Sequence, residues 1–172
     1  MKATYVLTIK AEDRPGLLHL VTGMIEKRLL RIKSLSLAPT DISFILLISI
    51  ELDSTDREIT SLALKLENIV EVMQVEVKLY EQVVCLRAAY FKLDKGLLAS
   101  PQASALVKYG AVIVQMTSDN FLAAKYGSDI AILNLYNELE GPHLLGFIQT
   151  GFITDTNLIG EDESSVINRL AA

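Results

Sequence analysis

The sequence lacks several features that would assign the protein to an exported or membrane class. It has a single cysteine, Cys85, among 172 residues, so no disulfide can form within the chain, which is typical of a reducing compartment. Its most continuous apolar run, Phe44–Ile48, is far shorter than the roughly 20 residues that span a bilayer. No apolar segment with a cleavage site follows Met1 and Lys2. We therefore expect a cytoplasmic protein with no secretory signal and no membrane partner.

An excess of positive charge is also missing. The chain has 16 Lys and Arg against 21 Asp and Glu, a net charge of −5 at pH 7, whereas nucleic-acid binding requires an excess of basic residues. We expect no nucleic-acid partner. One basic cluster is an exception, and an anion site is one interpretation of it. We favour the alternative that its residues complement the dipole of the first helix and are otherwise solvated. The cluster consists of Lys27, Arg28, Arg31 and Lys33.

Side chains that perform catalysis are few and isolated. His19 falls between apolar helix positions, His143 follows a Gly-Pro turn, and Cys85 stands among apolar residues in a predicted strand. The sequence has no metal-ligand spacing, phosphate-binding loop, dinucleotide fingerprint or Gly-x-Ser-x-Gly elbow. Glu161–Glu163 lies in a polar C-terminal segment, where solvation explains it. We expect no enzyme activity, no cofactor and no metal.

The sequence is rich in apolar residues, at 51%, and we interpret the surplus over one core as buried interface. In the first half, alternation at Tyr5, Leu7, Ile9 and Ala11 predicts a strand, and apolar spacing from Leu17 predicts a helix. Thr55 and Glu58 have the form of a capping box at the start of a second helix. Three more strands are predicted at Ile32–Ala38, Ile42–Leu52 and Val70–Tyr80. The resulting order, βαββαβ, indicates a ferredoxin-like domain.

The second half repeats this order. Ser100 and Pro101 predict the first residues of a helix that Gly110 ends, and Ser128 predicts the start of another. The strands are predicted at Val83–Phe91, Ala111–Thr117, Phe121–Tyr126 and Leu144–Thr154. We therefore predict an α+β fold of two tandem ferredoxin-like βαββαβ domains, residues 1–80 and 81–155, followed by a polar tail, 156–172.

Two sets of segments carry a family likeness. Residues 13–18, with 21–24 and 34–40 after them, resemble the ACT domain of the small regulatory subunit of acetolactate (acetohydroxyacid) synthase. Residues 108–114, the Tyr126–Gly127 turn and residues 147–153 resemble the C-terminal domain of that subunit. The likeness runs in order over about residues 4 to 155. It implies that the first domain is an ACT domain and that the chain is a divergent, non-catalytic regulatory subunit in branched-chain amino acid biosynthesis.

The resemblance also implies partners and a site. ACT domains of this family form homodimers through their sheets and bind an amino-acid effector at the interface, and the second domain helps to activate a thiamine-dependent catalytic subunit. A glycine-bearing turn before a helix offers N–H groups to a carboxylate, and Asp13 can meet an ammonium group. The alternative is a plain strand-to-helix turn. The implied ligand-binding residues are Asp13, Arg14, Pro15, Gly16, Leu17, Arg31 and Ile32.

Some positions depart from the family pattern. After the first helix, Leu29 and Arg31 stand where the family has Gly and an effector-contacting Asn, and Gln149 stands where its last strand has Arg. A guanidinium only donates hydrogen bonds, so we expect Arg31 either to clamp a carboxylate or to pair with Asp13, and ordinary valine binding to be weak or absent. A stand-alone ACT-type sensor without a synthase partner, or a structural oligomer, is the alternative function.

Overall fold

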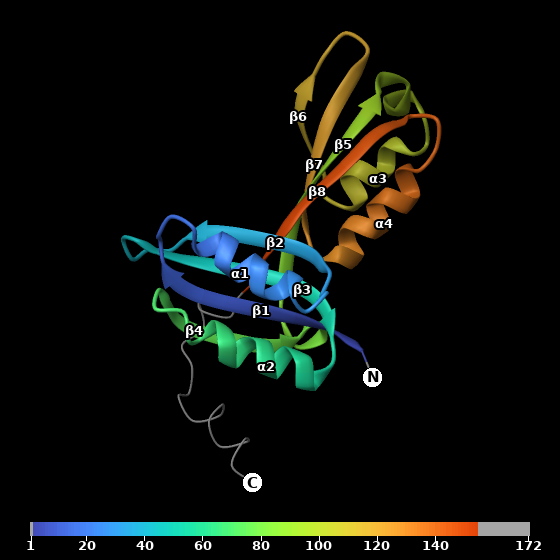
Figure 1. The fold of residues 1–172 in the computed structure, drawn as a ribbon. Helices are drawn as coiled ribbons and strands as arrows, with labels where there is room; N and C mark the ends of the chain where they lie inside the picture. Colours follow the sequence, from blue (N-terminus) through green and yellow to red (C-terminus); the bar gives the residue numbers. More distant parts are fainter. Residues whose placement is uncertain (1, 155–172) are drawn as a thin grey trace.

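A computed structural model describes residues 2–154. They form two four-stranded antiparallel sheets, each with two helices on one face (Figure 1). Each half has the order βαββαβ, so the predicted pair of tandem ferredoxin-like domains is confirmed. The predicted polar tail, 156–172, lies outside the described residues. No helix within residues 2–154 has the length and apolar character needed to cross a membrane.

The first domain is built around the central strand β1. The sheet order is β2-β3-β1-β4, and Leu7 and Ile9 of β1 pair with Ile50 and Ile48 of β3. These apolar side chains are fully buried against both helices, as the period-2 pattern predicts. The elements are β1 (Ala3–Glu12), α1 (Leu17–Glu26), β2 (Ile32–Pro39), β3 (Ile45–Ser54), α2 (Asp56–Leu66) and β4 (Val72–Leu79).

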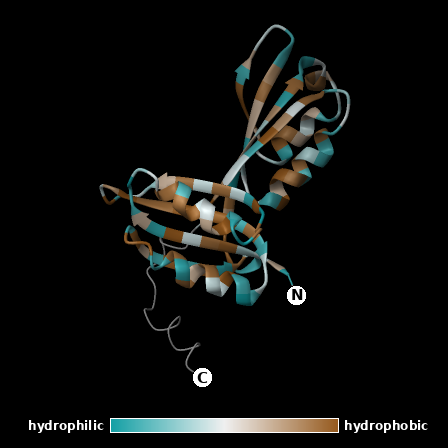
Figure 2. Cartoon of the chain, in the orientation of Figure 1, coloured by the Kyte–Doolittle hydropathy of each residue, from teal (hydrophilic) through white to brown (hydrophobic). Residues whose placement is uncertain are grey.

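The second domain repeats the arrangement, with sheet order β6-β7-β5-β8. Phe91 and Phe121 fill its core beneath Ile132 and Leu135 of α4. Figure 2 shows apolar residues along the strands of both sheets. The elements are β5 (Cys85–Asp94), α3 (Ala103–Lys108), β6 (Val112–Met116), β7 (Asn120–Gly127), α4 (Asp129–Leu139) and β8 (Leu144–Thr154), the last with the predicted bounds.

Several predicted boundaries differ from the structure, including β5 at Cys85–Asp94 against Val83–Phe91, and two predicted starts were wrong. Ser100 does not cap α3, because its hydroxyl donates to the carbonyl of Leu97 at 2.7 Å in a preceding 3₁₀ turn, and the helix begins at Ala103. Strand β3 begins at Ile45 rather than Ile42, because Phe44 adopts a φ of 64° that breaks the extended backbone. In both places a local turn replaces the start of the regular element.

The two domains meet where β5 begins and β8 ends. Val6 of β1 is fully buried against Cys85 and Phe152, so β1 is covered on the face opposite its helices as well. At Gly151, a Cβ atom would lie 2.9 Å from the carbonyl oxygen of Leu35 in β2. Close passage of β8 over β2 therefore requires a residue without a side chain.

Candidate functional site

The turn predicted to bind a ligand connects β1 to α1. Asp13 donates its backbone N–H to the carbonyl of Phe44 at 2.7 Å, which ties the turn to the β2–β3 loop. Gly16 is the N-cap residue of α1 with a φ of 90°, in the left-handed region. Gly16 supplies no side-chain cap, and the first turn of α1 has no acidic residue. The positive end of the helix dipole is therefore not compensated by residues of its own helix.

A hollow of about 420 Å³ opens beside this turn. Its wall contains one carboxylate and one guanidinium of the predicted site, Asp13 and Arg14, and the Nε atom of Arg14 lies 3.3 Å from Glu12. The ring of Phe44, 83% exposed, stands at its rim. A second hollow of about 250 Å³ shares Asp13 and Phe44. The turn thus borders a small space with both charges and an apolar edge.

The other predicted site residues lie apart from this hollow. Ile32 pairs with Leu52, and Leu52 pairs with Tyr5 at the far end of β1. Glu12 lies seven residues after Tyr5 along β1, or roughly 23 Å at about 3.3 Å per residue. Arg31, next to Ile32, therefore does not pair with Asp13 of the same chain. Pro15 and Gly16 are exposed in the turn, whereas the Leu17 side chain is buried in the core.

Sequence reasoning missed the residues opposite the turn. Ser43, Phe44 and Ile45 line the hollow, yet the apolar run from Ile42 to Leu52 indicated one uninterrupted strand. The positive φ of Phe44 is uncommon for an aromatic residue. The turn signal at Pro39–Asp41 was the available hint that a loop lies here.

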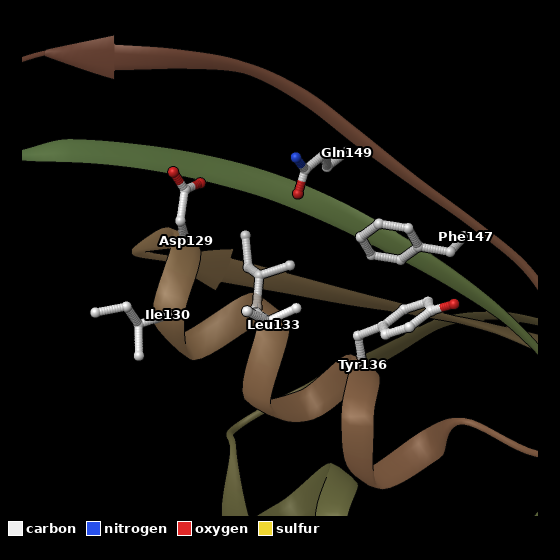
Figure 3. A pocket seen from close by; sticks show the side chains of 7 residues that line it. Asp129, Ile130, Leu133, Tyr136, Phe147 and Gln149 are labelled. Carbon is white, nitrogen blue, oxygen red and sulfur yellow. The ribbon is translucent and has the colours of Figure 1, made fainter. Parts of the chain in front are cut away.

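A second cavity, of about 410 Å³, lies in the second domain between α4 and β8 (Figure 3). Leu133 and Tyr136 of α4 face Phe147 of β8 across it, and Asp129 and Gln149 stand at one end (Figure 3). The Phe147 ring centroid is 5.0 Å from that of Tyr136, in an edge-on arrangement. Sequence analysis noted Gln149 for its departure from the family and did not predict this cavity.

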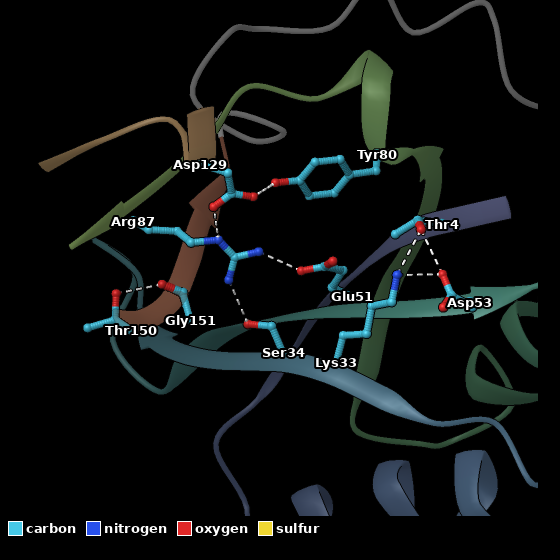
Figure 4. Close-up of polar contacts among 10 residues, drawn as sticks. All are labelled: Thr4, Lys33, Ser34, Glu51, Asp53, Tyr80, Arg87, Asp129, Thr150 and Gly151. Atoms are coloured by element: carbon cyan, nitrogen blue, oxygen red, sulfur yellow. Dashed lines mark hydrogen bonds and ion pairs between the residues drawn. The ribbon is translucent and has the colours of Figure 1, made fainter. Parts of the chain in front are cut away.

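Asp129 also belongs to a cluster of charges at the junction of the domains (Figure 4). Arg87 of β5 donates to Glu51 of β3 at 2.6 Å and to Ser34 of β2 at 3.3 Å, and it forms an ion pair with Asp129. Its side chain is 6% exposed, and its Cζ atom lies 5.2 Å from the centroid of the Phe152 ring. One buried guanidinium therefore joins both sheets and α4.

The cluster shifts the protonation of its members. Burial disfavours the charged form of Arg87, but hydrogen bonds to Glu51 and Tyr80 and the charge of Asp129 outweigh it, so the pKa of Arg87 is raised. Burial and a hydrogen bond from its hydroxyl to Asp129 raise the pKa of Tyr80 to about 12. Arg87 is therefore charged, and Tyr80 is neutral and a donor, at physiological pH.

The three isolated residues weighed for catalysis stay apart in the structure. His19 is exposed on α1, and the Nδ1 atom of His143 lies 3.5 Å from Asp94. Cys85 is buried beside Val6 and Phe152. Within residues 2–154, no three or more His, Cys, Asp or Glu side chains are grouped so as to hold a metal ion.

Comparison with known proteins identifies the fold. No family model matches the sequence, and no curated protein matches it either. The structure resembles the acetolactate synthase small subunit from Thermotoga maritima, with a TM-score of 0.78 and 16% identity over 88% of this chain and 95% of that one. At this identity the likeness shows a shared fold across both domains.

Two further structures are similar with lower TM-scores. The ACT domain of GTP pyrophosphokinase from Chlorobium tepidum has 24% identity over 45% of this chain and 100% of that one, with a TM-score of 0.40. The regulatory subunit of aspartate kinase from Thermus thermophilus has 8% identity over 80% and 93% of the two chains, with a TM-score of 0.46. Because these two likenesses are weak, neither bears on the function of this chain.

Proposed function

We propose that this protein is a non-catalytic regulatory subunit that senses a small amino acid or a related acid and modulates a catalytic subunit of the acetolactate synthase type. The observation that carries the proposal is the hollow beside the Asp13–Gly16 turn. Two carboxylates, Glu12 and Asp13, and the guanidinium of Arg14 line it. Gly16, the N-cap residue of α1, follows Arg14 by two residues and has no side-chain cap. An ammonium group fits Asp13, and a carboxylate fits the helix N-terminus.

We also propose that two chains form a dimer through their first-domain sheets and that this dimer completes the site. β2 is an edge strand, and it has no charged residue from Ser34 to Pro39, so little opposes its pairing with another strand. Antiparallel pairing of two β2 strands brings the start of one beside the end of the other. The partner subunit's Arg31 then lies at the end of the sheet that bears Asp13, where it can clamp a ligand carboxylate or close the site.

Calorimetry with valine, leucine and isoleucine tests the effector site. We expect weak or absent heat with the unmodified chain, because Arg31 stands where an acceptor is needed, and valine binding after Arg31→Asn. Asp13→Asn added to that variant should remove the binding again. Lys33→Asn, which removes a neighbouring positive charge, is the matched control and should not create binding. Tight valine binding by the unmodified chain would contradict the role given to Arg31, and no binding by Arg31→Asn would contradict the site.

The catalytic partner needs a separate experiment. We expect the full chain to co-elute with the large acetolactate synthase subunit of the same genome and to raise its activity. Failure of both, with valine binding by Arg31→Asn as expected, would leave a stand-alone sensor as the function. Failure of both, together with no ligand binding by Arg31→Asn, would leave a structural oligomer.

A further inference from the structure

The hollow between α4 and β8 has the volume of a small-molecule site. Its volume of about 410 Å³ falls in the range of roughly 300–1,000 Å³ that ligand pockets occupy. Ile130 and Leu133 of α4 are 71% and 57% exposed at its wall. Figure 3 shows the Phe147 ring beside that of Tyr136, with Leu133 on the same side of α4 as Tyr136. Apolar side chains that remain in contact with water gain free energy when an apolar ligand covers them.

The aromatic wall of the cavity is held in place from behind. The ring of Phe147 packs against Tyr136 and Phe91 with centroid distances of 5.0 Å to each, and Phe91 is fully buried in the core. Aromatic pairs in tilted and edge-on arrangements stabilise one another. These contacts therefore fix the position of the Phe147 ring before any ligand binds.

The charge cluster at the polar end of the cavity contains two carboxylates and one guanidinium. Arg87 is shared by two carboxylates, Glu51 and Asp129, while Tyr80 and Ser34 contribute neutral hydroxyl groups. The side chain of Asp129 is 39% exposed and borders the cavity, whereas that of Glu51 is 12% exposed. Among the described residues that line this cavity, none is a Lys or an Arg. Asp129 is thus the carboxylate of the cluster that meets solvent at the cavity; Arg87 pairs with one of its oxygens, the Tyr80 hydroxyl donates to the other, and the N-terminus of α4 stabilises its charge.

We propose that this cavity binds a primary amine with a branched or aromatic apolar body. The ammonium group lies between the carboxylate of Asp129 and the amide oxygen of Gln149, and the apolar body lies between Leu133 and Phe147. A ligand with its own carboxylate at this end is disfavoured, because it brings a second negative charge to the cluster. This ligand class and this location differ from those of the first-domain site.

Such a ligand acts on the junction between the domains. Asp129 holds Arg87, and Arg87 holds Ser34 and Glu51 in the first sheet (Figure 4). An ammonium group at Asp129 shares that carboxylate with Arg87 and Tyr80, so its binding is coupled to the contact between the domains. Binding to the folded chain then raises the thermal unfolding midpoint as ligand is added.

Calorimetry and thermal unfolding of the full chain at pH 7 test the proposal. The probes are 3-methylbutylamine and 2-phenylethylamine, with 3-methylbutan-1-ol and 3-methylbutanoate as isosteric neutral and anionic controls. We expect saturable binding of both amines in the millimolar range or tighter. Binding of 3-methylbutylamine should be at least tenfold tighter than that of the alcohol, and the acid should not bind.

Variants locate the binding. Leu133→Trp fills the cavity without touching the charge cluster and should weaken amine binding at least tenfold, and Asp129→Asn should weaken it to a similar degree. Leu145→Trp, on β8 outside the cavity, and Asp13→Asn, in the first-domain hollow, should leave amine binding unchanged. The proposal is overturned by equal binding of the alcohol, by no saturable amine binding, by no effect of Leu133→Trp, or by loss of binding in Asp13→Asn.

Discussion

Leu29 holds a backbone conformation that suits glycine better. It follows α1 with a φ of 56°, and its side chain is 94% exposed. Its N–H donates to the carbonyl of Glu26 at 2.8 Å, so the conformation ends the helix and turns the chain toward β2. A φ in this range is one that Gly adopts without strain, and here Leu adopts it.

Leu29→Gly should stabilise the protein. The left-handed conformation costs a residue with a Cβ atom about 1 kcal/mol, and a side chain this exposed loses little burial, so we expect the free energy of unfolding to rise by about that amount. Urea unfolding followed by circular dichroism measures it. Leu20→Gly is the control, because Leu20 is 49% exposed within α1, and it should lower the stability by about 1 kcal/mol. A loss of stability in both variants would contradict the strain at Leu29.

At the scale of the element, α2 shows how a short motif fixes a helix start. Thr55 accepts the N–H of Glu58 at 3.4 Å, and the Glu58 carboxylate accepts the N–H of Thr55 at 3.2 Å and its hydroxyl at 2.8 Å. These hydrogen bonds lower the pKa of Glu58 from its usual value, and the bond with the Thr55 hydroxyl has the largest effect. The predicted capping box is confirmed, whereas α1 begins at Gly16 without a side-chain cap.

Thr55→Ala should lower the free energy of unfolding by about 1 kcal/mol at pH 7. The Glu58→Gln variant tests a pH dependence, because Gln does not titrate. Folding lowers the pKa of Glu58, so its carboxylate stabilises the protein above the unfolded pKa and loses this effect as the pH falls through the folded pKa. The difference between wild type and Glu58→Gln should therefore be largest near neutral pH and vanish in acid. Urea midpoints measured from pH 7 to pH 3 check this.

Ser128→Ala on α4 serves as the control for the capping box. Ser128 accepts the N–H of Ala131, and no carboxylate stands at that third position. The variant should lose stability without the acid dependence that Glu58 confers. A pH-independent effect of Glu58→Gln would contradict the reciprocal bond.

At the scale of the whole molecule, one buried cation and one glycine add to the apolar contact of Val6 with Cys85 and Phe152 between the domains. Arg87 satisfies acceptors from β2, β3 and α4, and Gly151 lets β8 approach the backbone of Leu35. Neither role follows from local sequence, because the partners lie 36 or more residues away along the chain. Gly151 therefore stands where β8 passes so close to β2 that a side chain does not fit.

Gly151→Ala should destabilise the junction. The added Cβ atom meets a backbone carbonyl oxygen at 2.9 Å, and overpacking of this kind costs roughly 1–3 kcal/mol. Gly146→Ala is the matched control on the same strand, since its Cβ atom meets the Lys92 side chain at an ordinary 3.8 Å. Calorimetric unfolding should show a lower midpoint for Gly151→Ala and little change for Gly146→Ala. Equal effects of the two variants would contradict the close approach.

The sequence by itself determined the order of the elements, because alternation at Tyr5–Ala11, the stripe from Leu17 and the box at Thr55–Glu58 are local patterns. It also placed Asp13 and Arg14 beside a helix N-terminus, since the Asp-Arg-Pro-Gly turn is contiguous. Whether these residues bind a ligand stays a prediction. The start of β3 was missed because Phe44 is an apolar residue typical of strands, and its residue type does not indicate the positive φ that it adopts.

Tertiary structure alone decided which distant residues meet. Antiparallel pairing of β1 with β3, and of β3 with β2, sends Arg31 to the end of the sheet opposite Asp13. Packing of α4 on β8 creates the cavity that ends at Asp129, and the crossing of β8 over β2 buries Arg87 between the sheets. Strand register and the contact between domains depend on burial summed over the whole chain, and no short segment encodes them.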